Sequence, residues 1–165
     1  INIKNRPISI LTALSLIGIS MIQKDNIPCT NNIIDSIKRN FIHADFEHLS
    51  HNLFTFFLLS YVEEQIGSTA FLYLLCKLII VNVLIETVIN KVFKSTCSIG
   101  FSGVLFGLII WLYLQYEDTT PQLILSIIIM VIRPSLGNEG VSLLGHAIGA
   151  LSGVVIFTFD KSTLV

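Results

Sequence analysis

The feature that most constrains this sequence is a series of six long apolar stretches separated by short polar segments. Only 13% of the 165 residues are charged and 53% are hydrophobic, whereas charged residues make up about 25% of an average soluble domain. A water-soluble domain of this size must cover most of its residues with polar groups, which this chain lacks. The high hydrophobicity also excludes an intrinsically disordered chain. The sequence therefore predicts an all-α polytopic membrane protein with short loops.

The apolar stretches fit membrane-spanning helices. A helix needs about 20 residues to cross roughly 30 Å of hydrocarbon, and backbone polar groups in lipid must be paired within their own segment. None of the stretches alternates polar and apolar residues as β-barrel strands do. We predict one domain over residues 1–165. Its spans are expected roughly at residues 7–23, 48–62, 69–92, 99–116, 121–135 and 140–159.

The second and fifth stretches are short for a bilayer. The second can be extended upstream through Asp45 and downstream to Gly67. The longest connection, residues 24–47, contains a candidate amphipathic turn at residues 33–37 and is expected to lie on the membrane surface. The distribution of Lys and Arg gives conflicting indications about which end of the chain faces the cytosol, so orientation and the identity of the membrane stay open.

Charge and cysteine content exclude several classes of protein. The net charge is −1 with no basic cluster, so no nucleic-acid partner is expected. The spacing of Cys29, Cys76 and Cys97 is not that of metal ligands; Cys29 and Cys97 can lie on the same side of the membrane and pair, although inert buried thiols are the favoured interpretation. Lys77 and Glu86 lie nine positions apart in the third stretch, on opposite helix faces, so snorkelling or interhelical hydrogen bonds are favoured over a transport pathway.

Polar residues inside apolar spans are candidates for function, and the first cluster of them surrounds Ser102. The sequence Gly100-Phe-Ser102-Gly103 opens the fourth stretch. A serine at a helix start carries one of the unpaired backbone N–H groups, and glycines leave its hydroxyl accessible, as a nucleophilic serine requires. Taken alone, this short sequence is more typical of an N-cap serine with packing glycines.

The second cluster surrounds His146 in the sixth stretch. At about 100° per residue, Gly149 and Gly153 lie within about 60° of His146 on the helix wheel, so the histidine belongs to a small-residue face that permits close helix contact. A neutral histidine there can accept a proton from a serine on a facing helix. The alternative is a packing face with a hydrogen-bonded histidine. Gly149 is expected to face the fourth span, and substitution of Ser152 is expected to be milder than that of Gly149.

The third cluster opens the second stretch. His48 and Asn52 are separated by four residues and share a helical face, where both can donate hydrogen bonds to a negative oxygen, and Asp45 is placed to cap the helix. The neighbouring His43 and His51 raise the possibility of a metal site. The order of a metalloprotease sequence is absent and no second ligand cluster follows, so no metal is expected.

The three clusters are predicted to converge. They begin the second, fourth and sixth spans, and alternate spans run in the same direction through a bilayer. Their side chains should therefore lie at a similar depth on one side of the membrane. Together they supply a nucleophile, a base and hydrogen-bond donors, which favours a single catalytic site.

In these residues the sequence resembles the rhomboid family of intramembrane serine proteases. The similarity covers roughly residues 41–160 and rests on three segments in the family's order. The segments are His43-Ala-Asp45-Phe-Glu-His48-Leu-Ser-His-Asn52, with Glu63 and Gly67 after it, then Gly100-Phe-Ser102-Gly103, and Gly145-His146-Ala-Ile-Gly149-Ala-Leu-Ser-Gly153.

The resemblance implies a six-transmembrane-helix bundle and a Ser–His dyad, with Ser102 as the nucleophile and His146 as the general base. His48, Asn52 and the Ser102 backbone N–H would form the oxyanion hole. The resemblance also implies supporting roles for Gly100, Gly103, Phe106, Gly149 and Gly153, and a structural role for Glu63. Phe106 would pack on the catalytic histidine.

The expected function is hydrolysis of a peptide bond in or next to a transmembrane helix of a membrane-protein substrate, within the lipid bilayer and without a metal or other cofactor. The first loop, about 24 residues long, is shorter than is usual in the family, and the Trp-Arg pair common there is absent. The alternative is a catalytically inactive relative that binds membrane helices for quality control. Substrate identity and oligomeric state are left open.

Overall fold

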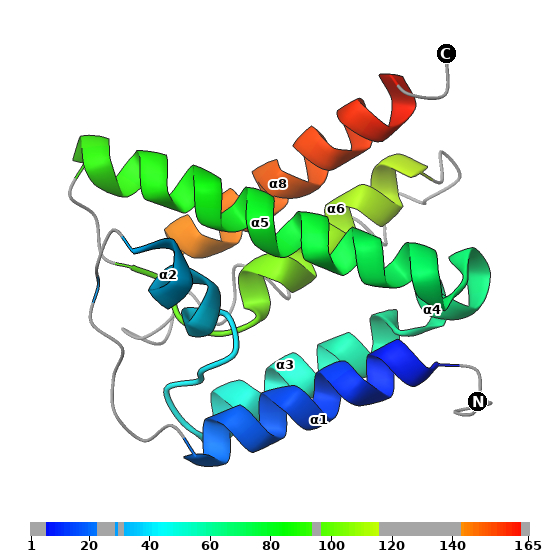
Figure 1. Cartoon of the computed structure of the whole chain (residues 1–165), viewed down its shortest axis with the longest axis horizontal. Helices are drawn as coiled ribbons and strands as arrows, with labels where there is room; N and C mark the ends of the chain where they lie inside the picture. The colour runs from blue at the N-terminus through cyan, green and yellow to red at the C-terminus, as the bar shows by residue number, and fades with distance from the viewer. Residues whose placement is uncertain (1–5, 23–28, 30–31, 94–96, 116–142, 163–165) are drawn as a thin grey trace.

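The computed structural model describes residues 6–22, 29, 32–93, 97–115 and 143–162, and every regular element within these ranges is a helix (Figure 1). The helices are α1 (Pro7–Ile22), α2 (Ile33–Arg39), α3 (Phe46–Leu59), α4 (Tyr61–Ile66), α5 (Ser68–Phe93), α6 (Ser102–Gln115) and α8 (Leu143–Ser162).

Four of the predicted spans correspond to α1, α5, α6 and α8, with boundaries that differ by a few residues. The predicted second span is divided into α3 and α4 at Ser60, and together they extend from the Asp45 cap to Gly67. The predicted fifth span, at residues 121–135, lies outside the described residues. Within the described part of the chain, Ser68–Val92 and Leu143–Asp160 are long and apolar enough to cross a membrane, while α1 and α6 are apolar but shorter.

Local sequence sets the helix boundaries. Pro7 stands at the first position of α1, where its missing N–H costs nothing. The Asp45 side chain accepts a hydrogen bond from His48 N at 2.7 Å and caps α3, as predicted. Gly67 ends α4 with a φ of 84°, a conformation that favours glycine. The resulting turn allows α5 to begin at Ser68.

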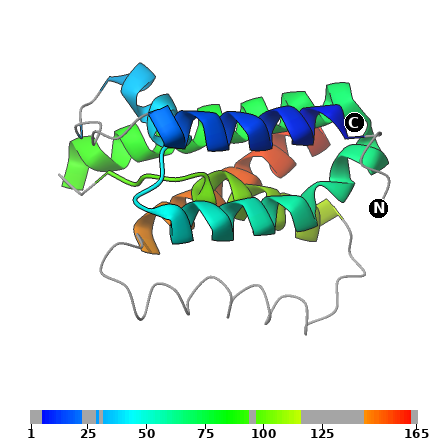
Figure 2. The ribbon, with the colours of Figure 1, turned by 90° about the horizontal axis from the view of Figure 1, so that it is seen from below.

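Figure 1 shows α1 and α3 lying side by side, and α6 and α8 running alongside each other. The long α5 contacts α1, α6 and α8 and thereby joins the two pairs. In the second view α6 lies among α3, α5 and α8 (Figure 2), and its buried side chains include Val104, Leu108 and Trp111. Helix α6 is therefore the centre of the described core, and it begins at Ser102.

Glycines bring α6 and α8 into backbone contact. A Cβ atom on Gly149 would meet the carbonyl oxygen of Gly103 and come within 2.7 Å of its carbonyl carbon, and one on Gly153 would meet the backbone of Gly107. Gly149 therefore faces the predicted fourth span. Ser152 is also fully buried here, and its hydroxyl would lie 2.9 Å from a Cβ on Gly107. Ser152 therefore lies in the same α6–α8 interface as Gly149, which argues against the expectation that its substitution is the milder of the two.

Polar contacts fix α1 to α4. Glu63, 1% exposed, accepts hydrogen bonds from Ile8 N at 2.9 Å, from Ser9 N at 2.8 Å and from the Ser9 hydroxyl at 2.7 Å. These backbone donors belong to the unpaired first turn of α1, so the carboxylate caps that helix. Arg6 adds an ion pair with Glu64 at 2.8 Å and a hydrogen bond to Ser60 at 2.7 Å.

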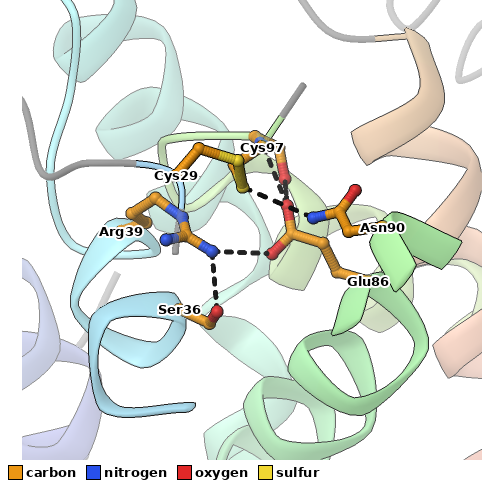
Figure 3. Close-up of a disulfide and its surroundings, with 7 residues drawn as sticks. Cys29, Ser36, Arg39, Glu86, Asn90 and Cys97 are labelled. Carbon is orange, nitrogen blue, oxygen red and sulfur yellow. Dashed lines mark hydrogen bonds and ion pairs between the residues drawn. A yellow bond between two sulfur atoms is a disulfide. The ribbon is translucent and has the colours of Figure 1, made fainter. Parts of the chain in front are cut away.

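The expectation of inert buried thiols is wrong. Cys29 and Cys97 form a disulfide with a Cα–Cα distance of 5.5 Å (Figure 3), and Cys76 is free and exposed. The bond joins the segment before α2 to the segment before α6. The proposed turn at residues 33–37 is the helix α2, capped by Asn32. Its Ile33 and Ile34 are exposed, but its Ser36 and Arg39 are buried.

Candidate active site

A polar cavity lies where the beginnings of α3, α6 and α8 meet. Its volume is about 50 Å³, which is enough for water, because one water molecule needs roughly 10–15 Å³. The predicted residues on its wall are Ser102, His146 and His48, together with Gly100 and Gly103. Asn40, Asn82, Cys97, Ser98, Ile99 and Gly145 complete the lining.

Ser102 is the first residue of α6. Its N–H therefore belongs to the first helical turn, in which backbone donors have no partner within the helix. Gly100, two residues earlier, has a φ of 99°, and a Cβ there would lie 2.6 Å from the His48 ring. Glycine at this position permits both the sharp entry into α6 and the close approach of His48 to the serine-bearing segment.

His146 is carried by the first turn of α8 and is 7% exposed. Its ring lies on that of Phe106, with centroids 4.3 Å apart and planes tilted by 37°. Phe106 stands one turn after Ser102 on α6, so this contact sets the histidine ring beside the helix that carries the serine. Within the described part of the chain, His146 Nδ1 is buried and has no hydrogen-bond partner. No described carboxylate therefore orients the ring through that nitrogen.

Asn52 is buried on α3 but is not among the residues that line the cavity. Its Nδ2 donates to the His48 carbonyl oxygen of its own helix at 2.8 Å. Its Oδ1 is buried without a partner among the described residues. The structure thus brings Ser102, His146 and His48 together, while the Asn52 amide is turned to its own helix.

Asn82 is a cavity residue to which sequence reasoning gave no role. It is 4% exposed on α5, and its Nδ2 would lie 2.5 Å from a Cβ on Gly103. The available signal was its position as an uncharged polar residue inside an otherwise apolar span, which favours a functional or packing role. The helix wheel of α5 alone does not show that this residue faces α6.

His43 connects three parts of the site from the loop before α3. Its Nε2 accepts a hydrogen bond from Phe101 N at 3.4 Å, its Nδ1 lies 3.1 Å from the Ser20 hydroxyl, and its ring contacts His48 edge-on at 5.1 Å. Burial and, to a smaller extent, the neighbouring His48 lower the pKa of His43 from 6.5 to about 4. The lowered pKa keeps the His43 ring neutral at pH 7, so its Nε2 can accept the N–H of Phe101, the residue before Ser102.

This lowered pKa predicts a loss of stability in acid. Since protonation favours the unfolded chain, the contribution of His43 is complete above pH 6.5 and decreases as the pH falls toward 4. The melting temperature of wild type in detergent should fall more over this range than that of His43→Gln, which can still accept a hydrogen bond but does not titrate. Parallel curves for the two proteins would contradict the assignment.

The described residues contain no group of three or more His, Cys, Asp or Glu side chains arranged to hold a metal ion. The histidines near the cavity contact one another and the backbone instead. His43 forms hydrogen bonds with the Ser20 hydroxyl and the Phe101 N–H, and His51 is exposed on α3.

The helical bundle places a serine at a helix start and a histidine of a second helix on the wall of one polar cavity. The family model for the rhomboid domain matches residues 31–162. A rhomboid protein of Acanthamoeba polyphaga mimivirus is 31% identical over 137 residues, which cover 80% of this chain and 80% of the viral protein. The chain therefore belongs to the rhomboid family and is a membrane protein.

Proposed function

We propose that the chain is an intramembrane serine endopeptidase that uses Ser102 as the nucleophile and His146 as the general base. The observation that carries this proposal is the presence of both side chains on one cavity wall, with His146 held against Phe106 of the serine-bearing helix. An inactive relative has no need to keep this pair together.

The proposed reaction proceeds by acyl transfer. His146 takes the proton of the Ser102 hydroxyl while the oxygen attacks the carbonyl carbon of the substrate. The tetrahedral intermediate breaks its C–N bond, and the leaving amine takes the proton from His146. Water then hydrolyses the acyl-enzyme by the same route, which returns Ser102 and releases a carboxylic acid. The polar cavity supplies room for this water beside the serine.

The negative oxygen of the intermediate needs hydrogen-bond donors. The Ser102 N–H and the His48 ring are suited to this role because both belong to the cavity wall. Asn52 is a third proposed donor, by resemblance to the family. Its Nδ2 already gives one of its two hydrogens to the His48 carbonyl, and Asn52 does not line the cavity, so we expect it to contribute less than the other two.

The proposed substrates are membrane proteins cleaved in or next to a transmembrane helix. Exposed apolar side chains on α1 and α5, among them Leu14, Met21, Leu72 and Val88, are suited to contact with lipid. We propose that the chain spans the bilayer six times, with the fifth span at residues 121–135. A helical substrate hides its carbonyl groups in its own hydrogen bonds, so cleavage requires local unwinding. No cofactor is needed for this chemistry.

Labelling with a fluorophosphonate, which reacts with activated serines, tests the proposal. Purified wild type should be labelled at Ser102. The Ser102→Ala variant should not be labelled, although its melting temperature should equal that of wild type. A folded wild type that binds transmembrane helices but neither takes up the label nor cleaves them would instead support the inactive, helix-binding alternative.

A further inference from the structure

A buried charge pair contacts the segment that leads to Ser102. Arg39 of α2 and Glu86 of α5 are 1% and 4% exposed, and Arg39 Nη2 lies 3.6 Å from Glu86 Oε2 (Figure 3). Arg39 Nη2 also donates to the Ser36 hydroxyl at 2.6 Å. Buried ionised groups are costly unless they are paired and hydrogen-bonded. The neighbouring Cys97, Ser98 and Gly100 line the cavity.

Each member of the pair also binds this segment. Glu86 Oε1 accepts a hydrogen bond from Ser98 N at 2.8 Å and from the Ser98 hydroxyl at 2.6 Å. The Arg39 carbonyl oxygen accepts one from Gly100 N at 2.9 Å. Residues 98 and 100 are thus tied to α5 and α2, and the disulfide ties Cys97 to the chain before α2.

We infer that Glu86 is a positioning residue for catalysis, held by Arg39, that fixes the Cys97–Phe101 segment and thereby the place of the Ser102 N–H and hydroxyl. This inference rests on the proposed function. The segment has two reasons to need an external restraint. Gly100 has no Cβ, so its backbone is conformationally free, and it adopts a φ of 99° here. The segment also precedes a helix start whose N–H must meet an oxygen within hydrogen-bond distance.

The charge itself is not what the segment needs from Glu86. Both contacts with Ser98 require only an acceptor oxygen, which a glutamine also offers. Arg39 keeps that oxygen in place by engaging the other one. A buried ion pair can often be replaced by apolar residues of similar volume without loss of stability. Stability and positioning can therefore be separated by mutation.

The test compares two double variants that carry no buried charge. Arg39→Met with Glu86→Gln keeps an acceptor for Ser98, and Arg39→Met with Glu86→Leu removes it. We expect similar melting temperatures and similar KM values for a transmembrane substrate, but a kcat about 10²-fold lower for the leucine variant, the scale of a misplacement near 1 Å. Lys77→Met with Asp160→Leu removes the exposed ion pair between α5 and α8, at 2.6 Å, and should keep wild-type kcat.

Hydrogen–deuterium exchange at residues 97–101 reads the same contact without catalysis. Exchange should be faster in the leucine variant than in the glutamine variant and the wild type. Equal kcat and equal exchange in the two double variants would overturn the inference, as would a loss of kcat that only follows a loss of melting temperature. Wild type without labelling or cleavage would refute the proposed function, and the exchange comparison would still decide whether Glu86 fixes the segment.

Discussion

His146→Ala and Ser102→Ala should each abolish cleavage of a transmembrane substrate, and the double variant should be no slower than either single variant. The effects of mutations within a catalytic unit on kcat are not additive. In a soluble serine protease, loss of the serine or of the histidine alone costs on the order of 10⁶-fold in kcat. Background hydrolysis inside a membrane is too slow to compensate. The measurement is cleavage by purified protein in detergent or liposomes.

Ser50→Ala and His51→Ala are the matched controls for this experiment. They make the same substitutions on α3, where His51 is exposed and the Ser50 hydroxyl donates to the Phe46 carbonyl of its own helix. Both should keep wild-type activity. A double variant far slower than Ser102→Ala or His146→Ala alone would show that the serine and the histidine act independently.

Gly149→Val should be nearly inactive while the protein still inserts into the membrane. Its Cβ would lie 2.7 Å from the carbonyl carbon and 2.8 Å from the Cα of Gly103, and neither backbone atom can move without shifting α6. Overpacking costs about 1–3 kcal/mol, whereas an increase of about 1 Å between Ser102 and His146 can cost 10²-fold in rate. The rate should therefore fall much more than the stability.

Gly18→Val provides the control for Gly149→Val. It introduces the same side chain into α1, where a Cβ would meet no atom within 4 Å, so cleavage and melting temperature should stay close to wild type. Ser152→Val is unsuitable as a mild comparison, because Ser152 is buried in the same helix interface. Wild-type cleavage by Gly149→Val would contradict the proposed dependence of the dyad on close α6–α8 contact.

The sequence predicted the helices best where a single strong rule applied. The long apolar stretches, the proline at the start of α1 and the Asp45 cap placed most helices to within a few residues. The sequence did not predict the division between α3 and α4 at Ser60. The division is slight, since the Ser60 backbone keeps a helical conformation with a φ of −64°. The alternation of spans also placed Ser102, His146 and His48 on one side of the bundle.

The sequence pattern could not predict which partners the buried polar side chains would choose. Arg39 lies in a connection that was expected on the membrane surface, yet it is buried against Glu86, more than forty residues away in the sequence. Glu86 itself carried a signal, because a charge inside an apolar span needs a partner, but periodicity cannot identify that partner. The Asn52 amide likewise donates to the His48 carbonyl of its own helix. That contact depends on local backbone geometry, which the sequence pattern does not give.

The bond between Cys29 and Cys97 bears on the compartment in which the protein works. Disulfides persist in oxidising surroundings and are rare where cellular thiols keep cysteines reduced. Cys97 also belongs to the cavity wall, so in the proposed six-span arrangement the cavity would share its side of the bilayer with the bond. The cavity would then open toward the lumen or the cell exterior and the start of α1 toward the cytosol, an orientation that the distribution of basic residues left open.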